Sequence, residues 1–114
     1  MYRKLETWKK AYALGIEVYR LTKSFPKEEL YGITSQMRRA ATSIAANVAE
    51  GNSRGSTKEN RQFVSIARGS ASELETWLMF AKDLGYLKAE DFQRVALLLD
   101  EVKRLLFGLL KSLE

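Results

Sequence analysis

A row of polar residues at helical spacing is the first place in this sequence where chemistry could occur. The row comprises Gln36, Arg39, Ser43, Asn47 and Glu50. Their steps of three and four residues place them along one edge of a helix. Together with Glu73 of a later segment, the hydroxyl of Ser43, the amide of Asn47 and the carboxylate of Glu50 could line a small-molecule or catalytic site.

Catalysis at this row would require a general base beside Ser43. The chain contains no histidine or cysteine, and residues 33–50 contain no lysine. Only a carboxylate whose pKa is raised by burial could activate the hydroxyl. A bundle-type di-iron site requires Glu-x-x-His pairs, which a chain without histidine does not offer. We therefore expect no catalytic residue, no cofactor and no metal site, and no enzymatic activity.

A structural role for the same residues is the alternative. If the segment after residue 56 runs antiparallel to residues 33–50, with the pivot near Ser53, then Arg39 lies level with Arg68 and with the turn that holds Glu73. This predicts a pair between Arg38 or Arg39 and Glu73. The expected interhelical network, which would set the register of the two helices, consists of Arg39, Ser43, Asn47, Glu50 and Glu73.

A stripe of cations is the better candidate for binding. Arg54, Lys58, Arg61 and Arg68 follow steps of four, three and seven residues, and Ser65 completes the spacing. Contacts to nucleic-acid phosphates need charge, reach and regular spacing, which this stripe supplies. The net charge of +5 and the pI near 9.6 favour polyanions. A solvated helix face, partly neutralised by Glu59 and Glu75, is the competing interpretation.

Two further basic clusters have weaker spacing. The first comprises Arg3, Lys4, Lys9 and Lys10, and the second comprises Lys103, Arg104 and Lys111. In the second cluster, Asp100 is placed to pair with Arg104 at a spacing of four residues. We expect both clusters to be solvated surface.

Four amphipathic segments must position these residues. Apolar periodicity predicts helices over about residues 5–23, 33–50, 57–84 and 92–113. Pro26 interrupts the first connection, and Ser56 and Glu59 form a capping box. Gly51 is expected to end its helix in a left-handed conformation, and Gly85 is expected to end the third helix. Short connections between long helices predict an all-α, antiparallel up-down four-helix bundle, with residues 1–114 as a single domain.

No stretch approaches the roughly 18 apolar residues of a membrane span, and residues 1–6 lack the apolar run of a signal peptide. The absence of cysteine is compatible with a reducing compartment. We expect a cytoplasmic protein with no membrane partner.

Several strings in this chain resemble one protein family. They are Phe25-Pro26, Glu29-Leu30-Tyr31-Gly32, Gln36-Met37-Arg38-Arg39-Ala40, Ser43-Ile44-Ala45-Ala46-Asn47-Val48-Ala49-Glu50-Gly51 and residues 66–75. The family comprises the four-helix bundle proteins encoded in intervening sequences of bacterial 23S ribosomal RNA genes, called S23 ribosomal proteins. The likeness covers essentially the whole chain. The accessory variability protein of diversity-generating retroelements is similar in architecture.

The resemblance implies a left-handed bundle that assembles into a ring, typically a homopentamer, with a basic surface. The accessory variability protein is associated with nucleic acid and a reverse transcriptase, so the implied partners are RNA or DNA and a reverse transcriptase or another protein. Two hypotheses remain open at this point. The chain is a homo-oligomeric, non-enzymatic bundle that binds nucleic acid through its basic surface, or it is a structural protein-interaction module without nucleic-acid binding.

Overall fold

Four long helices make up nearly all of the computed structural model, which describes residues 2–114 and their side chains from Arg3 onward. They are α1 (Tyr2–Thr22), α2 (Ile33–Asn52), α3 (Thr57–Asp83) and α4 (Ala89–Ser112), with a short 3₁₀ helix, η1 (Lys27–Glu29), between α1 and α2. Met1, which the expected domain 1–114 includes, lies outside the described residues. The prediction of an all-α four-helix bundle is confirmed.

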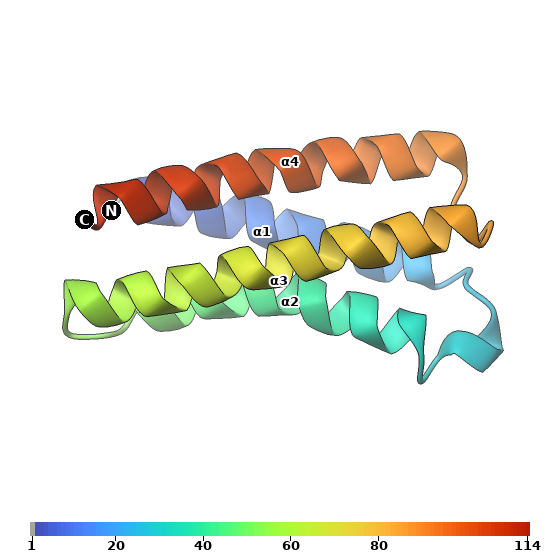
Figure 1. The fold of residues 1–114 in the computed structure, drawn as a ribbon, viewed down its shortest axis with the longest axis horizontal. Coiled ribbons are helices and arrows are strands. Elements are labelled where there is room, and N and C mark those ends of the chain that lie inside the picture. The colour runs from blue at the N-terminus through green and yellow to red at the C-terminus, as the bar shows by residue number, and fades with distance from the viewer. Residues whose placement is uncertain (1) are drawn as a thin grey trace.

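Each helix packs against two neighbours, so the four helices occupy the corners of a square. The adjacent pairs are α1 with α2, α2 with α3, α3 with α4, and α4 with α1. The chain runs up and down an elongated body 43 Å long (Figure 1). The α1–α2 pair and the α3–α4 pair are therefore opposite faces of the bundle, a relation that decides where its surface chemistry lies.

The apolar stripes of all four helices meet in one core. Its largest fully buried side chains are Leu14, Val18, Met37, Ile44, Val64, Leu74, Leu78, Val95, Leu99, Val102, Leu106 and Leu109. Burial of these side chains stabilises the bundle by about 1.5–3 kcal/mol for each residue of this size, before the cost of conformational entropy.

No helix among residues 2–114 is at once long enough and apolar enough to cross a membrane.

The start of α3 shows one half of the predicted capping box, and its end lies at Gly85 as predicted. The backbone N–H of Glu59 donates to Ser56 Oγ over 3.1 Å, although the Glu59 carboxylate accepts from the Ser56 hydroxyl instead of from its backbone. At the other end, Gly85 has a φ of +80°, and Tyr86 N donates to Ala81 O over 2.9 Å. This is a Schellman stop, which needs a glycine because other residues are strained at that φ.

Gly51 allows close helix packing and does not end α2 as the sequence predicts. The left-handed stop expected there is wrong, because α2 continues to Asn52 and Gly85 is the one glycine with positive φ in the described chain. A Cβ at Gly51 would lie 2.7 Å from Asn60 Oδ1 and 3.0 Å from Phe63 Cβ. The missing side chain lets the end of α2 approach α3 closely.

Tyr86, in the connection between α3 and α4, contacts the connection between α1 and α2 at the same end of the bundle. Tyr86 packs against the ring of Phe25, with centroids 5.4 Å apart, and donates from its hydroxyl to Glu29 Oε2 over 2.8 Å. This hydrogen bond to the Glu29 carboxylate raises the pKa of Tyr86 above its ordinary value. The contact fastens η1 to the connection between α3 and α4.

The two glycines Gly51 and Gly69 provide a matched test of the close approach. We expect Gly51→Ala to lower the free energy of unfolding by about 1–3 kcal/mol, because the added methyl group overlaps Asn60 and Phe63. Gly69 lies within α3, and a methyl group there would meet no atom within 4 Å, so Gly69→Ala should raise stability by about 0.5–1 kcal/mol. Urea denaturation measures both, and equal effects of the two substitutions would contradict the assignment.

Candidate nucleic-acid interface

Cations from α3 and α4 line the same face of the bundle. Lys58 and Arg61 of α3 border a hollow of about 760 Å³. Gln62, Ser65 and Ile66 of α3 and, from the far end of the chain, Leu110 and Glu114 complete its lining. Ser65 thus lies beside these cations, as its spacing predicts.

A second hollow, of about 250 Å³, continues the first along the same helix pair. Arg68, Gly69 and Ser72 of α3 border it, opposite Lys103 and Leu106 of α4. Between the two hollows, Arg68 and Lys111 both approach the ring of Phe107, with distances to the ring centroid of 5.5 Å and 5.8 Å. We name this surface the basic groove and define it by Lys58, Arg61, Arg68, Lys103 and Lys111.

The charge of the basic groove is only partly neutralised. Lys103 Nζ lies 2.9 Å from Glu75 Oε1, and Glu114 borders the first hollow. Arg61 donates to the backbone oxygen of Leu113 over 3.5 Å, which orients its guanidinium without cancelling the charge. Five cations therefore face two side-chain carboxylates. Exposed pairs such as Lys103–Glu75 contribute little energy, so a polyanion could compete for the lysine.

Arg54 lies apart from the other three predicted cations. Its Nη2 lies 2.6 Å from Glu50 Oε2, and its guanidinium carbon lies 4.9 Å above the ring of Phe63. Both contacts hold it at the connection between α2 and α3. Of the four-residue stripe, the structure brings Lys58, Arg61 and Arg68 into the groove and leaves Arg54 at its end.

Sequence reasoning separated residues that the fold joins. The sequence pattern predicts Lys103 and Lys111 as solvated surface on their own helix and gives no role to Phe107. Antiparallel pairing of α3 with α4 would have placed Lys103 and Lys111 on either side of the level of Arg68, so the register of the hairpin was the signal that could have found them. Arg104 points elsewhere and pairs with Asp100 at 2.8 Å, as predicted.

The polar row of α2 contributes one interhelical hydrogen bond. The hydroxyls of Ser43 and Ser70 lie 2.9 Å apart, joining α2 to α3. Asn47 Nδ2 donates to Ser43 Oγ over 2.9 Å and to the Ser43 carbonyl over 2.8 Å. Ser70 was not among the residues predicted for this network, and it supplies the contact that Arg39 and Glu73 were expected to make.

The predicted pair between an arginine of α2 and Glu73 is wrong. Glu73 Oε2 accepts a hydrogen bond from Trp77 Nε1 of its own helix over 3.1 Å. Arg38 turns toward α1, where its Nε donates to Thr22 Oγ1 over 2.8 Å, and Arg39 is exposed. Glu73 and Glu50 each pair with a residue four positions further along the chain, so neither carboxylate links α2 to α3.

The surroundings of Ser43 do not provide nucleophilic chemistry. Its hydroxyl contacts another hydroxyl and an amide, neither of which accepts a proton at neutral pH. Within residues 2–114, acidic side chains do not gather in threes at distances suited to a metal ion. The arrangement can set the register of two helices by hydrogen bonding.

A double-mutant cycle measures that role. Ser43→Ala and Ser70→Ala each remove one hydroxyl, and we expect a coupling free energy of about 0.5–1.5 kcal/mol in urea denaturation. Thr42 is the control, because its hydroxyl bonds to the Arg38 carbonyl of its own helix and it is exposed. Thr42→Ala and Ser70→Ala should be additive. A Ser43–Ser70 coupling of zero would remove the hydrogen bond as a register device.

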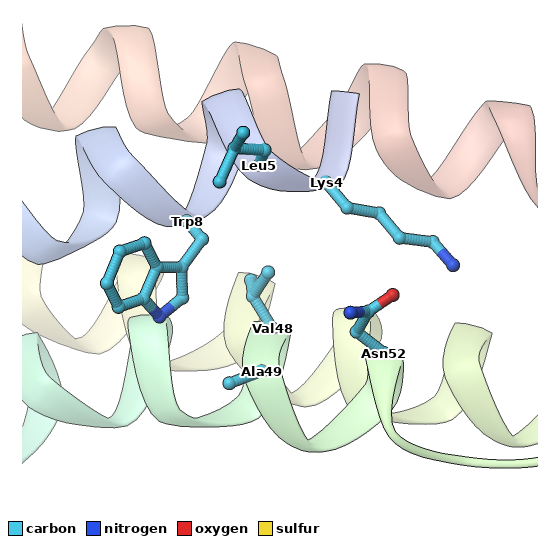
Figure 2. Close-up of a pocket in the computed structure, with 6 residues that line it drawn as sticks. All are labelled: Lys4, Leu5, Trp8, Val48, Ala49 and Asn52. Carbon is cyan, nitrogen blue, oxygen red and sulfur yellow. The ribbon is translucent and has the colours of Figure 1, made fainter. Parts of the chain in front are cut away.

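The opposite face, formed by α1 and α2, has different chemistry. A hollow of about 300 Å³ lies between the first turns of α1 and the last turns of α2, with Leu5, Trp8, Val48 and Ala49 as its apolar lining and Lys4 and Asn52 at its end (Figure 2). A second hollow, of about 320 Å³, continues it along the two helices. Its lining is Ala11, Tyr12, Gly15, Ile16, Tyr19, Thr42 and Ala45.

Large apolar side chains on this face remain accessible to solvent. Leu5, Tyr12, Ile16 and Tyr19 of α1 are between 40% and 53% exposed. The rings of Trp8 and Tyr12 stack with centroids 5.1 Å apart, so they form a continuous aromatic surface on this face. We name this surface the apolar groove and define it by Leu5, Trp8, Tyr12, Ile16 and Tyr19.

Comparisons with known proteins bear on the whole bundle. A family model described as 23S rRNA-intervening sequence protein matches residues 3–108. Curated protein sequences contain no match to this chain. A solved structure from Bacteroides thetaiotaomicron VPI-5482, described as a protein with unknown function from the S23 ribosomal protein family, is similar with a TM-score of 0.89 and 24% identity. The match covers 96% of this chain and 98% of that one, and at this identity it shows the fold alone.

Proposed function

We propose that this chain, which belongs to the 23S rRNA-intervening sequence protein family, binds RNA or DNA as a non-enzymatic homo-oligomer. One observation supports the binding role above the others. Lys58, Arg61 and Arg68 of α3 lie along one side of a groove whose other side carries Lys103 and Lys111 of α4. Five cations in one groove can contact several phosphates of one strand at once.

Phosphate binding fits the chemistry of the basic groove. Arginine and lysine contacts to the backbone release counterions and supply affinity that does not depend on base sequence. Lys58, Arg61 and Arg68 span ten residues of α3, about 15 Å at 1.5 Å per residue, so they can contact successive phosphates. Affinity from this surface should be strongly salt-dependent and broad in sequence preference.

Self-association is proposed for the opposite face. The apolar groove carries four large side chains that are at least 40% exposed, and a second copy of the chain would remove them from water. We propose that a neighbouring subunit of a ring covers the apolar groove. The family resemblance implies that this ring is a pentamer. In a ring of more than two subunits the apolar groove contacts a different surface of the next subunit, and we propose that this second surface lies outside the basic groove.

Assembly would strengthen the binding of nucleic acid. Five copies would carry a charge of +25, five times the +5 of one chain. Several grooves that contact one polyanion raise the apparent affinity through effective concentration, without any new contact within a groove. A weak phosphate surface on one subunit could thus become a useful binding surface on the ring.

Charge reversal in the groove tests the binding role. We expect Arg61→Glu with Arg68→Glu to weaken binding of a labelled RNA or DNA, and to reduce the slope of log K against log salt by about 1.4–1.8 for two lost phosphate contacts. Fluorescence anisotropy across a salt series measures both quantities. Circular dichroism should show an unchanged helical signal.

The control for this test is Arg20→Glu with Arg39→Glu. Both arginines are exposed and lie outside the basic groove, and each double variant lowers the net charge from +5 to +1. If the control pair weakens binding as much as the groove pair, net charge alone is responsible and the groove is not the site. If the wild-type protein binds neither RNA nor DNA at low salt, the nucleic-acid function is wrong.

A charged residue in the apolar groove tests self-association. Ile16 is 40% exposed, so Ile16→Asp should leave the helix folded while placing a carboxylate in the proposed contact. We expect light scattering coupled to size exclusion to report an oligomer for the wild type and smaller species for the variant. Ile66→Asp on α3, where Ile66 is 51% exposed, is the control and should keep the wild-type mass.

A wild-type protein that is monomeric at micromolar concentration would contradict the ring. The apolar groove would then favour the second candidate function, a protein-interaction module whose partner is another protein. The exposed Leu5, Tyr12, Ile16 and Tyr19 are the observation that favours this candidate.

A further inference from the structure

We propose that the basic groove takes a single strand of nucleic acid and that Phe107 stacks against one of its bases. This inference rests on the proposed nucleic-acid function and specifies its substrate. It starts from the position of Phe107, an aromatic ring that is half exposed in the middle of a cationic surface.

Two cations flank the ring of Phe107. The guanidinium carbon of Arg68 lies 5.5 Å from the ring centroid, and Nζ of Lys111 lies 5.8 Å from it. Both distances fall within the roughly 6 Å range of cation–π attraction. A nucleotide presents a flat base and a phosphate a short distance away, so a base that displaces one of these cations from the ring would leave its neighbouring phosphates within reach of Arg68 and Lys111.

The floor of the groove carries apolar side chains as well as cations. Ile66 is 51% exposed beside Lys58 and Arg61, and Leu106 and Leu110 line the two hollows. A duplex hides the faces of its bases and presents phosphates, so it would leave Ile66 and Phe107 exposed to water. A single strand has unstacked bases that can cover both side chains.

The dimensions of the groove favour the same ligand. Packed helices lie about 8–10 Å apart, so the depression between α3 and α4 is narrow and a duplex would touch only its rim. Lys58 and Arg68 are ten residues apart, about 15 Å along α3. With about 3.4 Å between phosphates in a stacked strand, this length corresponds to at most about four nucleotides for each subunit, and to fewer where the bases unstack.

The test compares single strands with a duplex on the full chain. The probes are a labelled 12-nucleotide oligo-dT, the matching oligo-U and a 12-base-pair DNA duplex, measured by anisotropy at low salt. We expect either or both single strands to bind at least fivefold more tightly than the duplex. We expect Phe107→Leu, which keeps an apolar side chain but removes the ring, to weaken single-strand binding at least fivefold, the lower end of the stacking contribution.

Phe80→Leu is the matched control. Phe80 is 53% exposed and packs against Trp77 outside the basic groove, so its loss should leave single-strand binding unchanged. Phe107→Trp provides a second measurement. A base that stacks on the new tryptophan should quench its fluorescence, so single-strand binding should lower the emission of this variant more than that of the wild type. Circular dichroism checks that every variant is folded.

The possible failures are distinguishable. Salt-dependent binding that Phe107→Leu leaves unchanged, or duplex binding as tight as single-strand binding, would overturn this inference and leave the proposed nucleic-acid function in place. Absence of binding to all three probes at low salt would overturn both. Weakening by Phe80→Leu equal to that by Phe107→Leu would also overturn the role of the ring, because it would show a general effect of losing an exposed aromatic residue.

Discussion

The close approach of α2 and α3 is the constraint on which the rest of the structure depends. At one end, Gly51 allows the last turn of α2 to lie against Asn60 and Phe63. Nearer the middle, the hydroxyls of Ser43 and Ser70 meet at 2.9 Å. Because the two contacts lie at different heights along the same helix pair, they determine both the spacing and the register of α3 against α2. The register of α3, together with its rotation about its own axis, decides which of its residues lie beside which residues of α4.

The square arrangement gives the bundle two opposite faces with different chemistry. The apolar groove lies on the α1–α2 side and carries exposed Leu5, Tyr12, Ile16 and Tyr19. The basic groove lies on the α3–α4 side, where Lys58, Arg61, Arg68, Lys103 and Lys111 gather. Apolar area favours contact with another protein surface, whereas closely spaced cations favour a polyanion. The surfaces proposed for self-association and for nucleic-acid binding therefore do not overlap.

Net charge is a poor guide to where an anion could bind on this molecule. Several arginines are occupied by neighbours: Arg54 by Glu50, Arg104 by Asp100, and Arg94 by Glu17 and Asp91, whose hydrogen bonds raise the pKa of Arg94. Arg61 and Arg68 instead contact a backbone oxygen and an aromatic ring, which leave the positive charge uncompensated. The difference between these groups comes from local partners, which composition does not record.

The sequence by itself determined the four helices and the bundle, because steps of three and four apolar residues impose one buried stripe on each helix, and Ser56 and Gly85 mark ends that backbone chemistry recognises locally. It also located three of the cations in the groove. Only the tertiary structure decided that Gly51 serves close packing, that Ser70 completes the contact with Ser43, and that Lys103, Lys111 and Phe107 join Arg68. Each of these depends on the register between two helices, and periodicity within one helix carries no information about its offset along a neighbour.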